Sequence, residues 1–289
     1  MLGLIVVAVL VGCVLSRMKE NAKPMVDLFQ CMYRVVMRLI GIFIWFTPVG
    51  LVFLISSSIV HTERPIVVLQ ELAIFFPTAV CCLMLHSFGS LSLLYFLVTK
   101  KNPYRFVLNM SKALLTAFGT SSSAATLPVT MDCLVSKNHV DSRVVNFITP
   151  IGAIINMDGT ALYVSMVTIF VSQRLGVTLD FGNYIIIGLS AFGISVGSAG
   201  VPGLGLVTMT IAAMAVGLPI DQILLVAPVD WIIERFRTVA NVYGDSVGAG
   251  IVNHLSSKVL NTTEQGFPQD AGSNDRYNSG SIKETESLV

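Results

Sequence analysis

Long apolar stretches, separated by short polar segments, dominate most of the chain. Four of them are long enough to cross a bilayer core, which needs roughly 20 residues. These stretches are 35–60, 65–98, 144–171 and 184–218. A shorter apolar run, 1–15, has neither a preceding basic residue nor an Ala-x-Ala pattern after it, so we interpret it as the second half of a helix rather than as a signal peptide. The pattern predicts a helical protein with at least four membrane spans.

Two apolar segments are interrupted midway by small residues and proline. Segment 104–132 is broken at 119–128, and segment 183–218 is broken at 195–205. Because Gly and Pro at this density end helices, each segment is predicted to be two half-helices that meet at an irregular tip. Such a tip is tolerated at bilayer depth only where protein or a water-filled cavity covers it. We therefore expect two re-entrant hairpins, although two kinked core helices would show the same pattern.

The two expected tips resemble each other. Ala125-Thr-Leu-Pro128 matches Ala199-Gly-Val-Pro202, and each is followed downstream by an Asn and Asp cluster, at 156–158 and at 241–245. The first hairpin is expected to open to the inside and the second to the outside. Paired interrupted segments in an inverted repeat indicate the binding site of a transporter.

Composition and charge agree with a membrane protein. Hydrophobic residues make up 54% of the chain and charged residues 12%, and the net charge is +1, which gives no pull toward nucleic acid. Basic residues gather at the borders that we assign to the cytoplasm. They are Arg17, Lys19, Lys23, Arg34, Arg38, Lys100, Lys101, Arg105, Lys112, Lys137 and Arg143. The polar segment 259–289 then forms a cytoplasmic tail, which is expected to be disordered.

A polar stripe marks the last apolar segment. At 100° per residue, the side chains of the stripe fall within roughly 80° of one helix face. They are Asp230, Glu234, Arg237, Asn241 and Asp245. A charge at membrane depth suggests function, and the planar guanidinium of Arg237 matches a carboxylate of a substrate. The alternative is that Arg237 only pairs with Glu234 or Asp230. Arg235 is expected to extend toward the membrane surface.

Two aspartates suggest cation sites. Asp158 and Asp245 each follow an Asn in a Gly-containing turn, where interrupted helical bonding would free carbonyl groups. Free carbonyls with a carboxylate suit a hard monovalent cation, and sodium is the expected one. Ordinary helix caps are the alternative.

Hydroxyl groups gather at the expected hairpin tips. Ser121, Ser122, Ser123 and Ser198 lie where half-helices begin, and free N–H groups there attract a carboxylate. An amino acid could be held by its α-carboxylate, with Glu234 or Asn241 accepting from its amino group. The serines are alternatively mere helix breakers.

Together these motifs resemble the sodium-coupled glutamate (excitatory amino-acid) transporter family. The motifs are Thr120-Ser-Ser-Ser, Ala125-Thr-Leu-Pro128, Asn156-Met-Asp-Gly-Thr-Ala-Leu-Tyr163, Ala199-Gly-Val-Pro202, Arg237-Thr238 and Asn241-Val-Tyr-Gly-Asp245. The resemblance reaches to about Ser256. It implies an all-α elevator fold, a homotrimer and a plasma-membrane location. The earlier scaffold helices and one transport-domain helix have no counterpart here, so we do not expect this chain to transport alone.

The resemblance also divides the chain. Residues 1–60 resemble scaffold and trimerisation helices, and residues 61–258 resemble a transport domain. Within that domain lie a span at 65–98, a hairpin at 104–137, a span at 143–173, a hairpin at 183–218 and a span at 221–256.

Site residues follow by motif from the same resemblance. Expected substrate contacts are Ser121, Ser122, Ser123, Thr160, Val201, Glu234, Arg237, Thr238 and Asn241. Expected sodium contacts are Gly152, Ile154, Asn156, Asp158, Ser195, Val196, Ser198, Asn241 and Asp245.

Three positions depart from the family pattern. Glu234 stands where the family has Asp, which reshapes the amino-group pocket, and Ala124 replaces a serine. Val164 stands where glutamate carriers have a proton-carrying Glu, so proton and potassium coupling are in doubt.

We therefore predict sodium-coupled uptake or exchange of L-glutamate or L-aspartate, and no enzymatic activity. Alternatives are a sodium-dependent neutral amino-acid exchanger, suggested by Val164, and a truncated partner of an intact carrier. A hydrolase using Ser122 and His86 lacks an oxyanion motif. The last residues, Ser287-Leu-Val289, fit a PDZ-type ligand.

Overall fold

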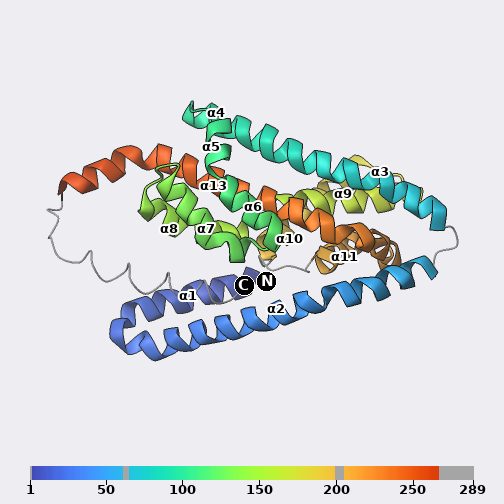
Figure 1. Ribbon diagram of the computed structural model, residues 1–289, viewed down its shortest axis with the longest axis horizontal. Coiled ribbons are helices and arrows are strands. Elements are labelled where there is room, and N and C mark those ends of the chain that lie inside the picture. The colour runs from blue at the N-terminus through green and yellow to red at the C-terminus, as the bar shows by residue number, and fades with distance from the viewer. Residues whose placement is uncertain (1, 61–64, 199–204, 267–289) are drawn as a thin grey trace.

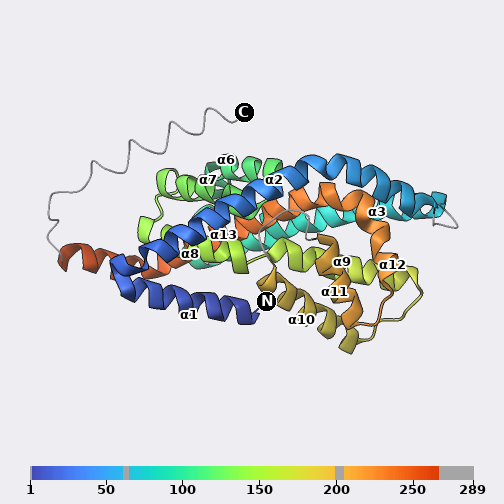
Figure 2. The same ribbon diagram turned by 90° about the horizontal axis from the view of Figure 1, so that it is seen from below.

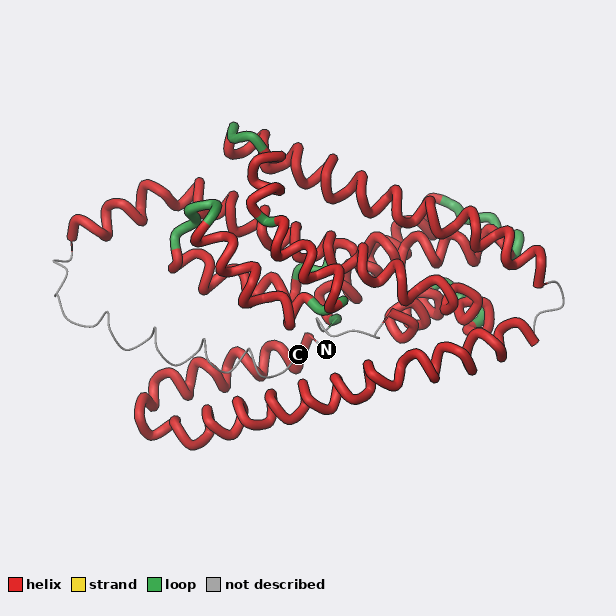
Figure 3. The backbone as a smooth tube through the Cα atoms, viewed as in Figure 1, coloured by secondary structure: helices red, strands yellow, loops and turns green. Residues whose placement is uncertain are grey.

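The computed structural model describes residues 2–60, 65–198 and 205–266, and this part of the chain is almost entirely helical (Figures 1 and 3). The predicted helical fold class is therefore confirmed. The elements are α1 Leu2–Met18, η1 Lys19–Ala22, α2 Lys23–Val60, α3 Pro65–Met84, η2 Leu85–Leu91, α4 Ser92–Thr99, α5 Pro103–Asn109, α6 Ser111–Thr120, α7 Ser123–Ser136, α8 Ser142–Ile155, α9 Asp158–Arg174, α10 Phe181–Gly197, α11 Gly205–Ala215, α12 Ile220–Ile223, η3 Leu224–Val226 and α13 Ala227–Gly266.

Helix α13 is the axis of the structure. It packs against α3, α4, α6, α7, α8 and α9, while α1 and α2 lie along one side of the molecule (Figures 1 and 2). Two apolar clusters bury its faces. One cluster includes Ile233 of α13 with Tyr163 and Met209, and the other includes Tyr243 of α13 with Met110. Burying both faces fixes which side of α13 is left for polar residues.

Of the two expected turns, one interrupts the helices in the structure and the other does not. Helix α8 ends at Ile155 and α9 begins at Asp158, so the chain leaves helical geometry at Asn156 and Met157. The expected turn at 241–245 is wrong, because α13 runs through it without a break. Both neighbours of Gly244 are well buried, and such packing outweighs the roughly 1 kcal/mol that Gly costs in a helix. Helix α13 also continues to Gly266, into the segment expected to be disordered.

Two pairs of short helices occupy the segments expected to form hairpins. Helices α6 and α7 pack together and are joined by Ser121, whose φ of 50° turns the chain, and Ser122. The Ser122 hydroxyl caps α7 by accepting from the N–H of Ala125 at 3.2 Å. Helices α10 and α11 also pack together, on either side of residues 199–204. The matched tip motif at 199–202 lies outside the described residues.

Polar contacts fasten the ends of several helices. Arg174 of α9 donates to Glu71 of α3 at 2.7 Å and to Gln222 of α12. At the start of α8, Asp141 caps the helix and pairs with Arg143 at 2.6 Å. The hydrogen bond from Arg143 holds the pKa of the Asp141 carboxyl below its usual value.

Two apolar helical stretches among the described residues are long enough to cross a membrane, namely Ile66–Thr99 and Ser142–Arg174. They correspond to two of the four predicted spans. The second stretch contains the break between α8 and α9.

Helix α13 offers a matched pair of glycines that tests its packing. A Cβ on Gly250 would lie 2.9 Å from Cε2 of Tyr95 and 3.2 Å from Cε2 of Phe106, and the centroids of these two tilted rings are 4.6 Å apart. A Cβ on Gly248 would meet nothing within 4 Å. We expect Gly250→Ala to lose about 1–3 kcal/mol of stability by overpacking, and Gly248→Ala to gain up to about 1 kcal/mol. Thermal unfolding in detergent measures both, and equal effects of the two substitutions would refute this packing.

Candidate functional site

The polar stripe of α13 is buried, as its placement on one helix face predicts. Asp230, Arg237, Asn241 and Asp245 are each less than a tenth exposed, and the Glu234 side chain is nearly as covered. Along the helix axis, Arg237 and Asp245 lie about 12 Å apart. The stripe therefore has two ends, one around Asp245 and one around Arg237.

The Asp245 end is built where the break after α8 meets α13. The side-chain amide of Asn156 donates to Oδ1 of Asp245 at 3.2 Å. Gly152 on α8 permits this approach, because a Cβ there would lie 2.6 Å from the same oxygen. Any side chain at position 152 would push the aspartate away.

A second close approach lies at the start of α9. Gly244 of α13 packs on Asp158, and a Cβ at 244 would lie 2.5 Å from Oδ2 of Asp158. The same oxygen is 3.9 Å from Nε2 of His86 in η2. The break thus brings Asn156, Asp158 and Asp245 to one place, although Asp245 comes from a continuous helix and not from the expected turn.

Asn241 connects the two ends of the stripe. Its Oδ1 accepts from the N–H of Gly159 at 2.8 Å, which satisfies a donor in the first turn of α9. Its amide nitrogen lies 3.5 Å from the hydroxyl of Thr160. The Arg237 carbonyl also lies against Gly159, where a Cβ would be 2.5 Å away. The start of α9 is therefore held in contact with α13 between Arg237 and Asp245.

The Asp245 end has the chemistry of a hard-cation site. Asp245 is 4% exposed, and none of the ion pairs in the described residues includes it. Its hydrogen bond comes from a neutral amide, and burying an uncompensated carboxylate costs several kcal/mol. The polar side chains that the contacts bring to this end are the carboxylates of Asp245 and Asp158 and the amide of Asn156. That donor set fits sodium.

The Arg237 end has the chemistry of an anion site. The guanidinium donates from Nη2 to Glu234 at 3.1 Å and lies over the ring of Tyr163 at 5.3 Å. Its Nη1 faces Gly205, where a Cβ would be 3.1 Å from it and 2.8 Å from Oδ2 of Asp230. Among the described residues, no hydrogen-bond partner reaches Nη1 of Arg237. A buried guanidinium with an unused donor can donate a hydrogen bond to an oxyanion.

Arg235 positions the first hairpin. Its Nη1 donates to the carbonyls of Phe118 and Gly119, both at 3.1 Å, at the C-terminal end of α6. The rings of Phe118 and Phe236 meet edge to face at 5.2 Å. The sequence did not predict these contacts, which satisfy carbonyls at the end of α6 that have no partner within the helix. The hairpin tip, with Ser122 and Ser123 buried, is thereby fixed against the turn of α13 that carries Arg237.

Several expected site residues are not brought into these two groups. The side chain of Ile154 is 53% exposed, and Thr238 donates its hydroxyl to the carbonyl of Glu234 in its own helix. Val196 and Ser198 lie at the end of α10, next to residues 199–204, and Val201 lies outside the described residues. Ser195 does reach the break, where its hydroxyl accepts from the N–H of Met157 at 3.2 Å.

Some residues of the site were not among the expected contacts. Tyr163, Asp230 and Gly205 surround Arg237, yet the motifs gave them no role. Asp230 shares the polar stripe of Arg237, which is a usable signal, whereas contacts of Tyr163 and Gly205 require the fold. His86 faces Asp158, and the Ser122 hydroxyl is used in capping α7, so no described contact pairs them as a hydrolase requires.

Comparison with known proteins identifies the family of the chain. The profile of the Sodium:dicarboxylate symporter family matches residues 1–255. Human excitatory amino acid transporter 1 is 47% identical over 259 residues, which are 90% of this chain and 48% of that protein. Human excitatory amino acid transporter 5 is 45% identical, covering 89% of this chain and 46% of that protein. Mouse excitatory amino acid transporter 4 is also 45% identical, covering 91% and 47%.

The chain spans about half the length of these curated relatives. The resemblance expected from the motifs is confirmed, because the profile match covers most of the chain and the relatives agree with it. The chain belongs to the sodium:dicarboxylate symporter family, a family of membrane transporters.

Proposed function

We propose that this protein carries out sodium-coupled transport of L-glutamate or L-aspartate across the plasma membrane. The observation that carries the proposal is Arg237, which is buried and has an unused donor on Nη1. Arg237 already pairs with Glu234 through Nη2, and a substrate carboxylate would in addition satisfy the Nη1 donor, which an apolar substrate side chain would leave unused. The family name, sodium:dicarboxylate symporter, agrees with a substrate that carries two carboxylates, and the relatives are named as amino acid transporters.

Different residues of the site bind the different polar groups of the substrate. Arg237, with Thr160 nearby, receives the side-chain carboxylate of the substrate. The tip at Ser121, Ser122 and Ser123 receives the α-carboxylate, since the first turn of α7 directs N–H groups there. Glu234, with Asn241, accepts from the amino group. Sodium, when bound, compensates the charge of Asp245 and Asp158.

We propose that coupling does not use a proton carried at position 164. Val164 is fully buried in the apolar cluster that contains Tyr163 and Val167. Nothing at that position titrates. Exchange of acidic amino acids without net uptake is then compatible with the site. Exchange of neutral amino acids is not favoured, because the surroundings of Arg237 suit an acidic substrate.

The wider assembly is proposed from the resemblance. Residues 61–258 would form a transport domain with two re-entrant hairpins that moves as an elevator, in a homotrimer, with a cytoplasmic C-terminus. A PDZ-type contact at 287–289 belongs to the same proposal and lies outside the described residues.

Uptake tests the proposed substrate. In proteoliposomes holding the complete product of the gene, we expect labelled L-aspartate to enter only with an inward sodium gradient. Arg237→Cys should lower the apparent affinity about 100-fold or more, because the substrate carboxylate loses a buried charged partner. Lys112→Cys, which removes an exposed base, is the matched control. Sodium-independent uptake, or stronger competition by L-serine than by L-glutamate, would overturn the proposal.

Sodium binding is tested without transport. We expect sodium, compared with choline, to raise the melting temperature of the purified chain, because a ligand of the folded state stabilises it. Asp245→Asn should abolish this shift and be at least as stable as the parent without sodium, since it removes an uncompensated buried charge. Asp132→Asn, at an exposed carboxylate 3.8 Å from Lys112, should keep the shift. An undiminished shift in Asp245→Asn would exclude this sodium site.

A further inference from the structure

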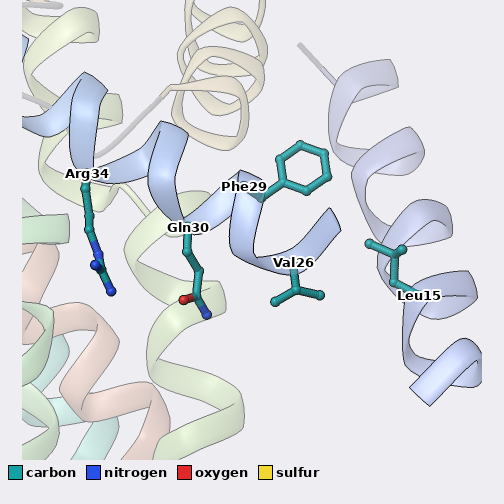
Figure 4. A pocket seen from close by; sticks show the side chains of 5 residues that line it. All are labelled: Leu15, Val26, Phe29, Gln30 and Arg34. Carbon is teal, nitrogen blue, oxygen red and sulfur yellow. The ribbon is translucent and has the colours of Figure 1, made fainter. Parts of the chain in front are cut away.

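The open cavity between α1 and α2 contributes no residue to the polar stripe of α13. The cavity, of about 500 Å³, is lined by Leu15 of α1 and by Val26, Phe29, Gln30 and Arg34 of α2 (Figure 4). Both helices fall within residues 1–60, which resemble scaffold helices. The contacts that can select a substrate are those around Arg237.

Glu234 and Arg237 form a buried ion pair on α13. Oε1 of Glu234 accepts from Nη2 of Arg237 at 3.1 Å, and the two side chains are 13% and 6% exposed. The residues are three apart, so both lie on one face of the helix. An aspartate at position 234 would have one methylene fewer, and its carboxylate would lie about 1.3 Å closer to the backbone. The extra methylene of Glu234 thus extends its carboxylate toward the guanidinium.

Neighbouring elements restrict the guanidinium of Arg237. The ring centroid of Tyr163 in α9 is 5.3 Å from its Cζ. A Cβ on Gly205 in α11 would lie 3.1 Å from Nη1 and 2.8 Å from Oδ2 of Asp230. Arg237 is therefore enclosed by α9, by α11 and by the earlier turns of its own helix. We expect the guanidinium to stay beside Glu234 when a substrate binds, because the backbone of α11 leaves it little room to withdraw.

The proposed acceptor for the amino group and the proposed donor for the side-chain carboxylate lie side by side. Glu234 accepts from Nη2, while Nη1 of the same guanidinium is the unused donor. A substrate that uses both must bring its amino group and its side-chain carboxylate close together. Two carbons separate these groups in L-aspartate and three in L-glutamate, and each methylene adds about 1.3 Å to an extended chain. The shorter dicarboxylate fits this spacing better.

The other end of the substrate is restricted as well. In the proposed function its α-carboxylate binds at the tip formed by residues 121–123. Nη1 of Arg235 donates to the carbonyls of Phe118 and Gly119 just before that tip, both at 3.1 Å. Because Arg235 and Arg237 belong to the same stretch of α13, the tip and the guanidinium are both fastened to one helix. A longer substrate cannot gain room by moving the tip away from Arg237.

We propose that Glu234 makes the site select L-aspartate over L-glutamate. The inference rests on the proposed function, in which Glu234 accepts from the amino group and Arg237 binds the side-chain carboxylate. The extra methylene of Glu234 occupies the length that the extra methylene of glutamate needs, so the longer acceptor is matched to the shorter substrate. One methylene changes the selectivity of enzymes by roughly 10-fold to 200-fold, and we expect L-aspartate to bind about 10-fold more tightly here.

Equilibrium binding to the complete product of the gene tests this selectivity. Calorimetric titrations with L-aspartate and with L-glutamate, at saturating sodium, give the ratio of the two dissociation constants, glutamate over aspartate. We expect a ratio of about 10 in the parent and about 1 in Glu234→Asp, because the shorter acceptor restores room for the longer substrate. Both ligands are measured on one preparation, so a variant that is partly unfolded does not alter the ratio.

Two further variants separate length from charge and from general effects. Glu234→Gln keeps the length and removes the charge, so it should weaken the binding of both acids and keep the preference for L-aspartate. Glu71→Asp removes the same methylene from a carboxylate of α3 that accepts from Arg174 at 2.7 Å. It lies outside the polar stripe and should leave the ratio at about 10.

The inference alone is overturned if both acids bind the parent with equal affinity, or if Glu234→Asp keeps the ratio of the parent. The same holds if Glu71→Asp lowers the ratio as much as Glu234→Asp does. Loss of the preference in Glu234→Gln would show that charge and not length selects the substrate, and would overturn it too. Failure of both acids to bind, or tighter binding of L-serine than of either acid, would overturn the proposed function and this inference with it.

Discussion

The candidate site depends on one contact, the approach of the α8–α9 break to α13. Asn156 bonds Asp245, Asn241 bonds the N–H of Gly159, and the absence of side chains at Gly152 and Gly244 lets the two backbones come this close. The contact exposes the first N–H groups of α9 to side chains of another helix and brings two aspartates together. Without it, α9 would begin without its Asn241 acceptor, and the polar stripe of α13 would face apolar neighbours.

This contact also explains how a cation could influence a substrate some 12 Å away. The start of α9 is bonded to Asn241, which lies on α13 between Asp245 and Arg237. In the proposed function, sodium that compensates Asp245 would stabilise the break, and the break places Gly159 against the carbonyl of Arg237. Binding of sodium at the Asp245 end and binding of substrate at the Arg237 end would then favour the same arrangement of α9 on α13. Each ligand would raise the affinity for the other, because such coupling is reciprocal.

The helical class, the two interrupted segments and the buried polar stripe could be predicted from the sequence, because they follow from periodicity and from the placement of Gly and Pro. The break at Asn156 was predictable for the same reason. The continuity of α13 was not, since an Asn and a Gly predict a turn unless tertiary packing outweighs them, as it does here around Tyr243. The role of Arg235 was missed because the carbonyls of Phe118 and Gly119 come near only through the fold. Tyr163 and Gly205 around Arg237 were missed for the same reason.

The central claim is that cation and substrate bind to one coupled site on α13. Calorimetric titration of the purified protein with L-aspartate, repeated across a range of sodium concentrations, tests it most directly. We expect an apparent affinity that rises with sodium and loses this dependence in Asp245→Asn while Arg237 is intact. An affinity for L-aspartate that stays constant as sodium is raised would contradict it.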